Sequence, residues 1–324
     1  MIASNGCRDI PAASPPPEGP CMSPPLVSVA VFAYNEEEGI TAALERLDAC
    51  GTGAELRIHV LINGCTDQTE AVVRAFQPRQ STVVPVVIVK GDKANAWNHY
   101  VHEVAPEAAA IHVFTDGDML ISPGSVTAFL DAFAAEPQAD GCAGLPVTGR
   151  SLAAFRAKLA SRREMAGNLY ALRGRCVQEF RRRGVRLPFG IFGEDGLVTA
   201  LVKYGLDMRG RQDDRRVAVA EGAGFAFPPL SPWRPRDWRI YRNRKMRYAV
   251  RRQQARMLYG LLKERGTEAM PAHVVDLYRL RGPALKLTWN GTDTPFDWVA
   301  IRRIRRDIAA DESVKLEDRA HLYS

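Results

Sequence analysis

The stretch HVFTDGDMLISPG, residues 112–124, places two carboxylates one residue apart at the end of an apolar run. Residues 110–116 are rich in β-forming side chains and predict a strand, and Pro123-Gly124 predicts a turn. Burying even one carboxylate costs on the order of several kcal/mol unless its charge is compensated. A divalent cation would compensate both, because Mg2+ and Mn2+ favour carboxylate oxygens together with phosphates. The alternative interpretation of Asp116-Gly117-Asp118 is an ordinary polar turn.

Short apolar runs alternate with helical patterns around this stretch. Strands are predicted over residues 26–34, 55–64, 84–90 and 110–116, with helices over 36–50, 66–76, 92–104 and 122–135. Such alternation with short connections predicts βαβ units, and therefore an α/β fold with a mainly parallel sheet flanked by helices. Ligands of these sheets bind where the carboxyl ends of the strands meet.

The pattern changes after residue 140. A strand is predicted over 139–147, one long helix over 151–174, a glycine-rich loop entering a helix over 189–205, and a strand over 215–227. The remainder is predicted to be mostly helical.

The composition limits the classes of protein that need to be considered. With 324 residues, of which 46% are hydrophobic, the chain can build one large core and a smaller annex. It contains no apolar run of about 18 residues, so no membrane-spanning helix is expected. The six cysteines form no CxxC pair, which favours reduced thiols and a cytoplasmic location.

The net charge of +7 is concentrated in three segments, residues 173–186, 234–252 and 301–306. Basic clusters attract phosphates, nucleic acid or anionic lipid, but they are equally typical of solvated helix faces. No RRM, KH or helix-turn-helix signature accompanies them, so no nucleic acid partner is expected.

Polar side chains follow several of the predicted strands and should converge on one crevice. Asn35 and Glu36 follow the first strand, Asn63 the second and Lys93 the third. Each has a simpler interpretation: a helix cap, a turn residue or a surface lysine. Glu194-Asp195 opens a helix between glycines, where carboxylates either complement the helix dipole or act as a general base. Gly117 is expected to let the backbone approach a ligand closely.

Five motifs occur in an order and spacing that resemble the family 2 glycosyltransferases of the GT-A fold. They are VAVFAYNEEEGI (29–40), LINGCTDQT (61–69), GDKANAWN (91–98), FTDGDMLISPGSV (114–126) and GEDGLVTAL (193–201). The resemblance covers residues 27–205. It divides the chain into a disordered proline-rich leader (1–25), a GT-A glycosyltransferase domain (26–230) and a basic, mostly helical region (231–324).

The resemblance implies metal-dependent, inverting transfer of a hexose from a nucleotide-diphosphate sugar, with a UDP-sugar favoured. The implied donor site comprises Tyr34, Asn35, Glu36, Asn63, Lys93, Asp116 and Gly117. Asp118 would be the main ligand of Mg2+ or Mn2+, assisted by Asp116, and Asp195 would be the catalytic base with Glu194 beside it. Many family members have an acidic residue at the position of Asn63, so the identity of the nucleobase stays open.

The C-terminal third leaves the acceptor undefined. Arg239, Arg242 and Arg244 are candidates to contact the diphosphate or an anionic acceptor. Trp298, Ile301, Ile304 and Ile308 form one helical stripe, which would either pack on the catalytic domain or lie on an anionic membrane. The acceptor is thus a lipid-linked or cell-envelope glycan intermediate or a small molecule, with the protein at the inner membrane face in the first case.

Two other classes of protein remain as alternatives. A GT-A-like nucleotidyltransferase would also use carboxylate-bound metal, but it typically has a glycine-rich loop where this chain has YNEEEGI. The other is a non-enzymatic basic protein that binds lipid or nucleic acid.

Overall fold

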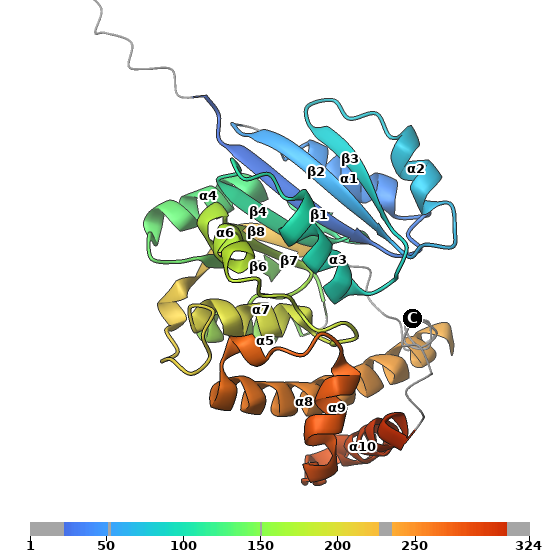
Figure 1. The fold of residues 1–324 in the computed structure, drawn as a ribbon. Coiled ribbons are helices and arrows are strands. Elements are labelled where there is room, and N and C mark those ends of the chain that lie inside the picture. Colours follow the sequence, from blue (N-terminus) through green and yellow to red (C-terminus); the bar gives the residue numbers. More distant parts are fainter. Residues whose placement is uncertain (1–22, 51–52, 150, 227–234, 310–324) are drawn as a thin grey trace, which may run out of the picture.

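The computed structural model describes residues 23–309 apart from 51–52, 150 and 227–234, with the side chains of 235–241 and 309 also left out. An eight-stranded mixed sheet runs in the order β3-β2-β1-β4-β7-β6-β8-β5 (Figure 1). The strands are β1 Leu26–Ala33, β2 Glu55–Asn63, β3 Thr82–Ile88, β4 Ile111–Asp116, β5 Leu120–Ile121, β6 Gly141–Pro146, β7 Leu169–Arg173 and β8 Val217–Ala226. The predicted α/β class is confirmed.

The parallel half of the sheet explains why strand ends converge. β3, β2, β1 and β4 pair in parallel, and Phe32 of β1 lies beside both Leu61 and Asp116. Alternate residues of β1 enter different cores, with Val31 on one face and Phe32 on the other. The ends of β1, β2 and β4 therefore meet at one edge.

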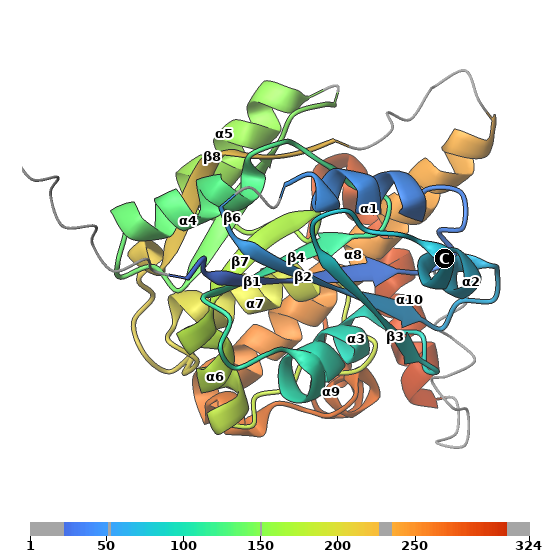
Figure 2. The same cartoon turned by 90° about the horizontal axis from the view of Figure 1, so that it is seen from above.

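Helices cover both faces of this sheet. They are α1 Ile40–Asp48, α2 Thr69–Ala75, α3 Lys93–His99, α4 Ser125–Ala135, α5 Leu152–Arg162, α6 Gly174–Arg182, α7 Glu194–Lys203, α8 Pro235–Arg265, α9 Val274–Arg281 and α10 Thr294–Ala309. Figure 2 shows α1, α4 and α5 on one face and α3 and α6 on the other. Helices α8 to α10 lie below the sheet in Figure 1 and share the core of α3 and α6. None of the helices in the described residues meets the length and hydropathy needed to cross a membrane.

The prediction of one helix over 151–174 is wrong. Helix α5 ends at Arg162, where Arg163 adopts a left-handed φ of 46°. The chain then returns as β7, an antiparallel strand between β4 and β6, with Tyr170 only 1% exposed. Pairing with two neighbouring strands outweighs the helical spacing of the apolar residues, which fits either structure locally.

The predicted helix start at Ser122 is also wrong, by three residues. Ser122, Pro123 and Gly124 form a turn instead, and Gly124 has φ 78°. The Ser125 hydroxyl donates a hydrogen bond to the Ser122 carbonyl at 2.7 Å. The left-handed glycine sets the direction in which α4 leaves the turn.

The isoleucine stripe of α10 packs on the protein itself. Ile301 and Ile304 are 4% and 1% exposed and join the core shared with α8 and α9. Trp298 is half exposed, and the Arg302 guanidinium lies 4.6 Å from its ring centroid. Of the two predictions for this stripe, packing on the protein itself explains why Ile301 and Ile304 are buried.

Candidate active site

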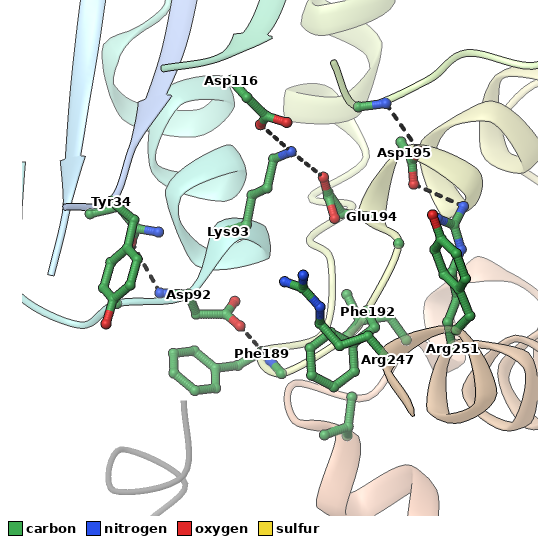
Figure 3. Close-up of a pocket in the computed structure, with 18 of the residues that line it drawn as sticks. Tyr34, Asp92, Lys93, Asp116, Phe189, Phe192, Glu194, Asp195, Arg247 and Arg251 are labelled. Atoms are coloured by element: carbon green, nitrogen blue, oxygen red, sulfur yellow. Dashed lines mark hydrogen bonds and ion pairs between the residues drawn. The ribbon is translucent and has the colours of Figure 1, made fainter. Parts of the chain in front are cut away.

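A cavity of about 440 Å3 opens at the carboxyl edge of the parallel strands, between the sheet and α8 (Figure 3). The predicted site residues that line it are Tyr34, Asn63, Lys93, Asp116, Glu194 and Asp195. Those that do not line it are Asn35, Glu36, Gly117, Asp118, Arg242 and Arg244. The side chain of Arg239 lies outside the described residues.

Lys93 forms ion pairs with two carboxylates in this cavity. Its Nζ lies 2.5 Å from Asp116 Oδ1 and 2.9 Å from Glu194 Oε1. Burial alone would lower the pKa of Lys93, but these two carboxylates hold it well above its usual range. Burial raises the pKa of both Asp116 and Glu194, although Lys93 opposes the shift. One lysine thus ties the end of β4 to the start of α7.

Asp195 is held by donors on three sides. Its Oδ1 accepts hydrogen bonds from the Gly196 N–H at 2.8 Å and forms an ion pair with Arg251 Nη2 at 2.9 Å, while Oδ2 accepts from the Gly167 N–H at 3.0 Å. Gly193, with φ 76°, precedes α7, and a Cβ there would meet the Arg251 guanidinium at 2.1 Å. Only glycine lets Arg251 reach the carboxylate from α8.

Asn63 and Asp92 shape the side of the cavity next to β2. The Asp92 N–H donates to Asn63 Oδ1 at 3.0 Å. The Asp92 carboxylate in turn accepts from the Asn95 N–H at 2.8 Å, which caps α3, and from the Gly190 N–H at 3.1 Å. Burial raises the pKa of Asp92 to about 6. Asn63 therefore orients the loop that presents Lys93.

Asn35 and Glu36 support the loops beside the cavity. Asn35 adopts a left-handed φ of 54°, and its Oδ1 accepts from the Thr66 N–H at 2.8 Å. Helix α1 begins after Gly39 without a side-chain cap, so the alternative that Asn35 caps it is wrong. Burial, with the nearby charges of Asp118 and Asp116, raises the pKa of Glu36 to about 7.

Gly117, the glycine of the DGD turn, allows this turn to pack closely against β1. A Cβ on Gly117 would lie 3.1 Å from the Phe32 carbonyl oxygen and 3.2 Å from Ala33 Cα. The close approach expected of this glycine is therefore to β1 and not to a ligand. Asp118 is exposed beyond it and forms no ion pair within the described part of the chain.

The carboxylates fit a divalent cation, although the described residues contain no ready-made group of three ligands. Although the Asp118 side chain is exposed, desolvation by the protein atoms around it raises its pKa, against the opposing charges of Lys93 and Arg244. The negative charge of Asp118 in turn contributes to raising the pKa of Asp116 and of Glu36. Mg2+ typically uses one or two protein carboxylates and completes its shell with water and substrate phosphates. An exposed, unpaired Asp118 beside Asp116 matches that pattern.

Several cavity residues were missed at the level of sequence, namely Asp92, Phe189, Phe192, Arg247, Tyr248 and Arg251. The last three lie on α8, where Arg247 and Tyr248 are adjacent and Arg251 lies one turn further on. The spacing of Arg244, Arg247 and Arg251 marks one helical face. Arg242 lies instead in a separate cleft with Phe296 and Val299 of α10. The positive charge of Arg244 opposes the rise in the pKa of Asp118.

Replacing Lys93 with methionine is expected to lower the free energy of unfolding by about 2 kcal/mol near neutral pH, because the buried Glu194 and the partly buried Asp116 lose their counter-charge. Their pKa values would rise further, so the loss should shrink in acid, where both become protonated. Urea unfolding at about pH 8 and about pH 5 measures this difference.

Two further variants test the cause of the Lys93 effect. Adding Glu194→Gln to Lys93→Met should recover part of the lost stability, whereas the exposed Lys158→Met should change it by less than about 0.5 kcal/mol. An equal loss at both pH values, without rescue, would show that Lys93 contributes through packing alone.

Comparison with known proteins gives one family match and several similar structures. The sequence model described as Glycosyl transferase family 2 matches residues 28–192, more than half of the chain. A comparison with curated protein sequences found no match.

The similar solved structures share low identity with this chain. The mannosyltransferase PcManGT from Pyrobaculum calidifontis, in complex with GDP-Man and Mn2+, is 16% identical, with 93% of this chain and 79% of that chain covered and a TM-score of 0.49. Glucosyl-3-phosphoglycerate synthase from Mycobacterium tuberculosis, with Mn2+, UDP-Glc and phosphoglyceric acid, is 20% identical, with 70% and 79% covered and a TM-score of 0.47. S. aureus TarS 1–349 is 17% identical, with 92% and 86% covered and a TM-score of 0.46.

Proposed function

The chain belongs to glycosyl transferase family 2, and from this premise we propose that it transfers a hexose from a nucleoside-diphosphate sugar to a hydroxyl acceptor, with inversion at the anomeric carbon. The observation that carries the proposal is the Asp116–Lys93–Glu194 chain of charges beside Asp195, at the carboxyl edge of the parallel strands. Ligands of α/β sheets bind at this edge.

The donor would lie along the ends of β1 and β2. Tyr34 and Asn63 line that side of the cavity, and Lys93 stands where it meets Asp116. Asp118 and Asp116 would hold Mg2+ or Mn2+, which supplies positive charge where negative charge develops on the leaving diphosphate. The ion pair with Lys93 favours the ionised form of Asp116 and orients its side chain for that role.

Asp195 would act as the general base. Its Oδ2 accepts one protein hydrogen bond and so retains a lone pair for the acceptor hydroxyl. As this oxygen takes the proton, the acceptor oxygen bonds to the anomeric carbon, and the bond to the diphosphate breaks with its electron pair. Arg251 and two backbone N–H groups fix the carboxylate throughout. A product of retained anomeric configuration would refute this mechanism.

Nucleotide binding tests the donor site directly. Calorimetric titration with UDP, GDP, dTDP and CDP, each with and without Mn2+, should identify one nucleotide whose affinity falls about tenfold or more without metal. The same loss is expected for Asp118→Ala in the presence of metal, because the exposed carboxylate is replaced without disturbing the core.

Asp131→Ala is a suitable control, since it removes an acidic side chain on α4 that does not line the cavity. It should bind like the wild type. A folded wild-type protein that binds none of the four nucleotides would overturn the proposal and favour the non-enzymatic alternative.

A further inference from the structure

One of the cavity's cationic side chains has no carboxylate partner among the described residues. Among the described lining residues the cationic side chains are Lys93, Arg247 and Arg251, and ion pairs engage the first and the last. Arg247 makes no hydrogen bond or ion pair with any described residue. The cavity therefore presents a guanidinium whose five N–H donors remain available to a ligand.

The surroundings of Arg247 make its lack of a partner costly. Its side chain is half buried, and burial together with the nearby Arg244 lowers its pKa. The other carboxylates that line the cavity are engaged elsewhere. Asp92 accepts two backbone hydrogen bonds, Glu194 pairs with Lys93 and Asp195 with Arg251. Asp307 also has an interaction of its own. A desolvated cation is stabilised when an oxyanion binds it, and a guanidinium fits phosphate or carboxylate through two parallel hydrogen bonds.

The position of Arg247 indicates which substrate carries the oxyanion. On α8, the charge of Arg244 opposes the rise in the pKa of Asp118, where the diphosphate is expected. Arg251 forms an ion pair with Asp195. Arg247 lies between these two arginines, one turn from each, and projects from α8 into the cavity (Figure 3). A hydroxyl that reaches Asp195 belongs to a molecule lying along this part of α8.

We propose that the acceptor is an anionic molecule, a hydroxyl compound carrying a phosphate or carboxylate group, and that Arg247 binds this group. The proposal rests on the proposed function, because it takes Asp195 as the base that marks the acceptor position. The donor diphosphate is the other source of the same chemistry. Arg247 would then contribute to nucleotide affinity, which the experiment measures separately.

The experiment uses inorganic phosphate as the probe, at constant ionic strength. Phosphate is titrated into the protein saturated with Mg2+ and the nucleoside diphosphate that it binds, and the arginine Nε–Hε NMR signals are followed. The signal that is absent in Arg247→Ala identifies Arg247. That signal should shift with phosphate, and the variant should bind phosphate about tenfold more weakly or not at all, with nucleotide affinity within about twofold of the wild type.

Controls separate a ligand role from a structural one. Arg256→Ala removes an exposed arginine from the same helix, outside the cavity, and should leave phosphate binding unchanged. The thermal midpoint of Arg247→Ala should be unchanged or higher, because an unpaired buried charge is removed. A lower midpoint would instead assign Arg247 a structural role and count against the proposal.

Three binding results would overturn the proposal. The first is absence of phosphate binding to the wild type, and the second is equal binding to Arg247→Ala. The third is displacement of phosphate by the nucleotide, together with about tenfold weaker nucleotide binding by the variant, which would assign Arg247 to the donor diphosphate. If no nucleotide binds, the proposed function fails, whereas phosphate binding to the ligand-free protein still reports on Arg247.

Discussion

Replacing Asp195 with asparagine is expected to lower the turnover number about a thousandfold, the usual effect of losing a general base. Both oxygens of Asp195 accept hydrogen bonds from donors, so an amide group in either orientation also meets an N–H group. The variant therefore loses both the base and its fixed orientation. Release of the nucleoside diphosphate from the sugar nucleotide measures the rate, with water as acceptor until the natural one is identified.

Glu194→Gln is the matched control for Asp195→Asn. Glu194 is buried and paired with Lys93, so its replacement should affect the donor side more than the proton transfer. Affinity for the nucleoside diphosphate should stay within about threefold of wild type in Asp195→Asn, because that side chain lies outside the proposed donor site. If Asp195→Asn keeps most of the wild-type rate while Glu194→Gln loses it with unchanged nucleotide affinity, the base is Glu194 and not Asp195.

The strand ends could be predicted from sequence because local patterns determine them. Each of the first four strands is a short apolar run closed by a polar residue, and parallel pairing brings such ends to one edge. Asn63, Lys93 and Asp116 therefore converge as predicted. The position of Lys93 between Asp116 and Glu194 could not be predicted, because it depends on how α7 packs against α3.

The second half of the chain was harder to predict, because its structure depends on packing between elements that are far apart in the sequence. Strand β7 owes its conformation to β4 and β6, and nothing within residues 169–173 distinguishes a strand from a helix. Arg247 and Arg251 belong to a basic segment that could equally well have faced solvent. Only the packing of α8 against the cavity gives these two side chains distinct partners, a carboxylate for Arg251 and none among the described residues for Arg247.

A polar network buried near the amino ends of β1 and β4 is the least predictable feature of the core. Tyr100 lies at its centre, with its hydroxyl 2.6 Å from Ser28 Oγ and 2.9 Å from His112 Nδ1. Ser28 Oγ also lies 3.2 Å from His59 Nδ1. All four side chains are at most 5% exposed. They come from β1, β2, β4 and the π-helical turn Tyr100–Val104, so only the assembled sheet brings them together.

This network is expected to make the fold labile in acid. Burial, with the charge of Arg57, lowers the pKa of His59 to about 4, and burial with Arg181 lowers that of His112 to about 3. Unfolded histidines have a pKa of about 6.5 and take up protons first. The stabilisation from keeping both rings neutral is complete above that value and is lost as the pH falls through the folded pKa values. The loss reaches about 5 kcal/mol between pH 8 and pH 4.5.

Replacing His112 with glutamine should remove about half of this acid-dependent loss, because one of two buried titrating groups is gone. Denaturant unfolding of the wild type and of His112→Gln from about pH 8 to about pH 4.5 measures the two slopes. His99→Gln is the control for the substitution itself, since His99 is partly exposed beside Glu103 and lies outside the buried network. The carboxylates contribute equally to all three proteins, so the difference between slopes isolates the histidine. Identical slopes in wild type and His112→Gln would mean that His112 has the same pKa in the folded and the unfolded protein, so that its burial does not disfavour the imidazolium.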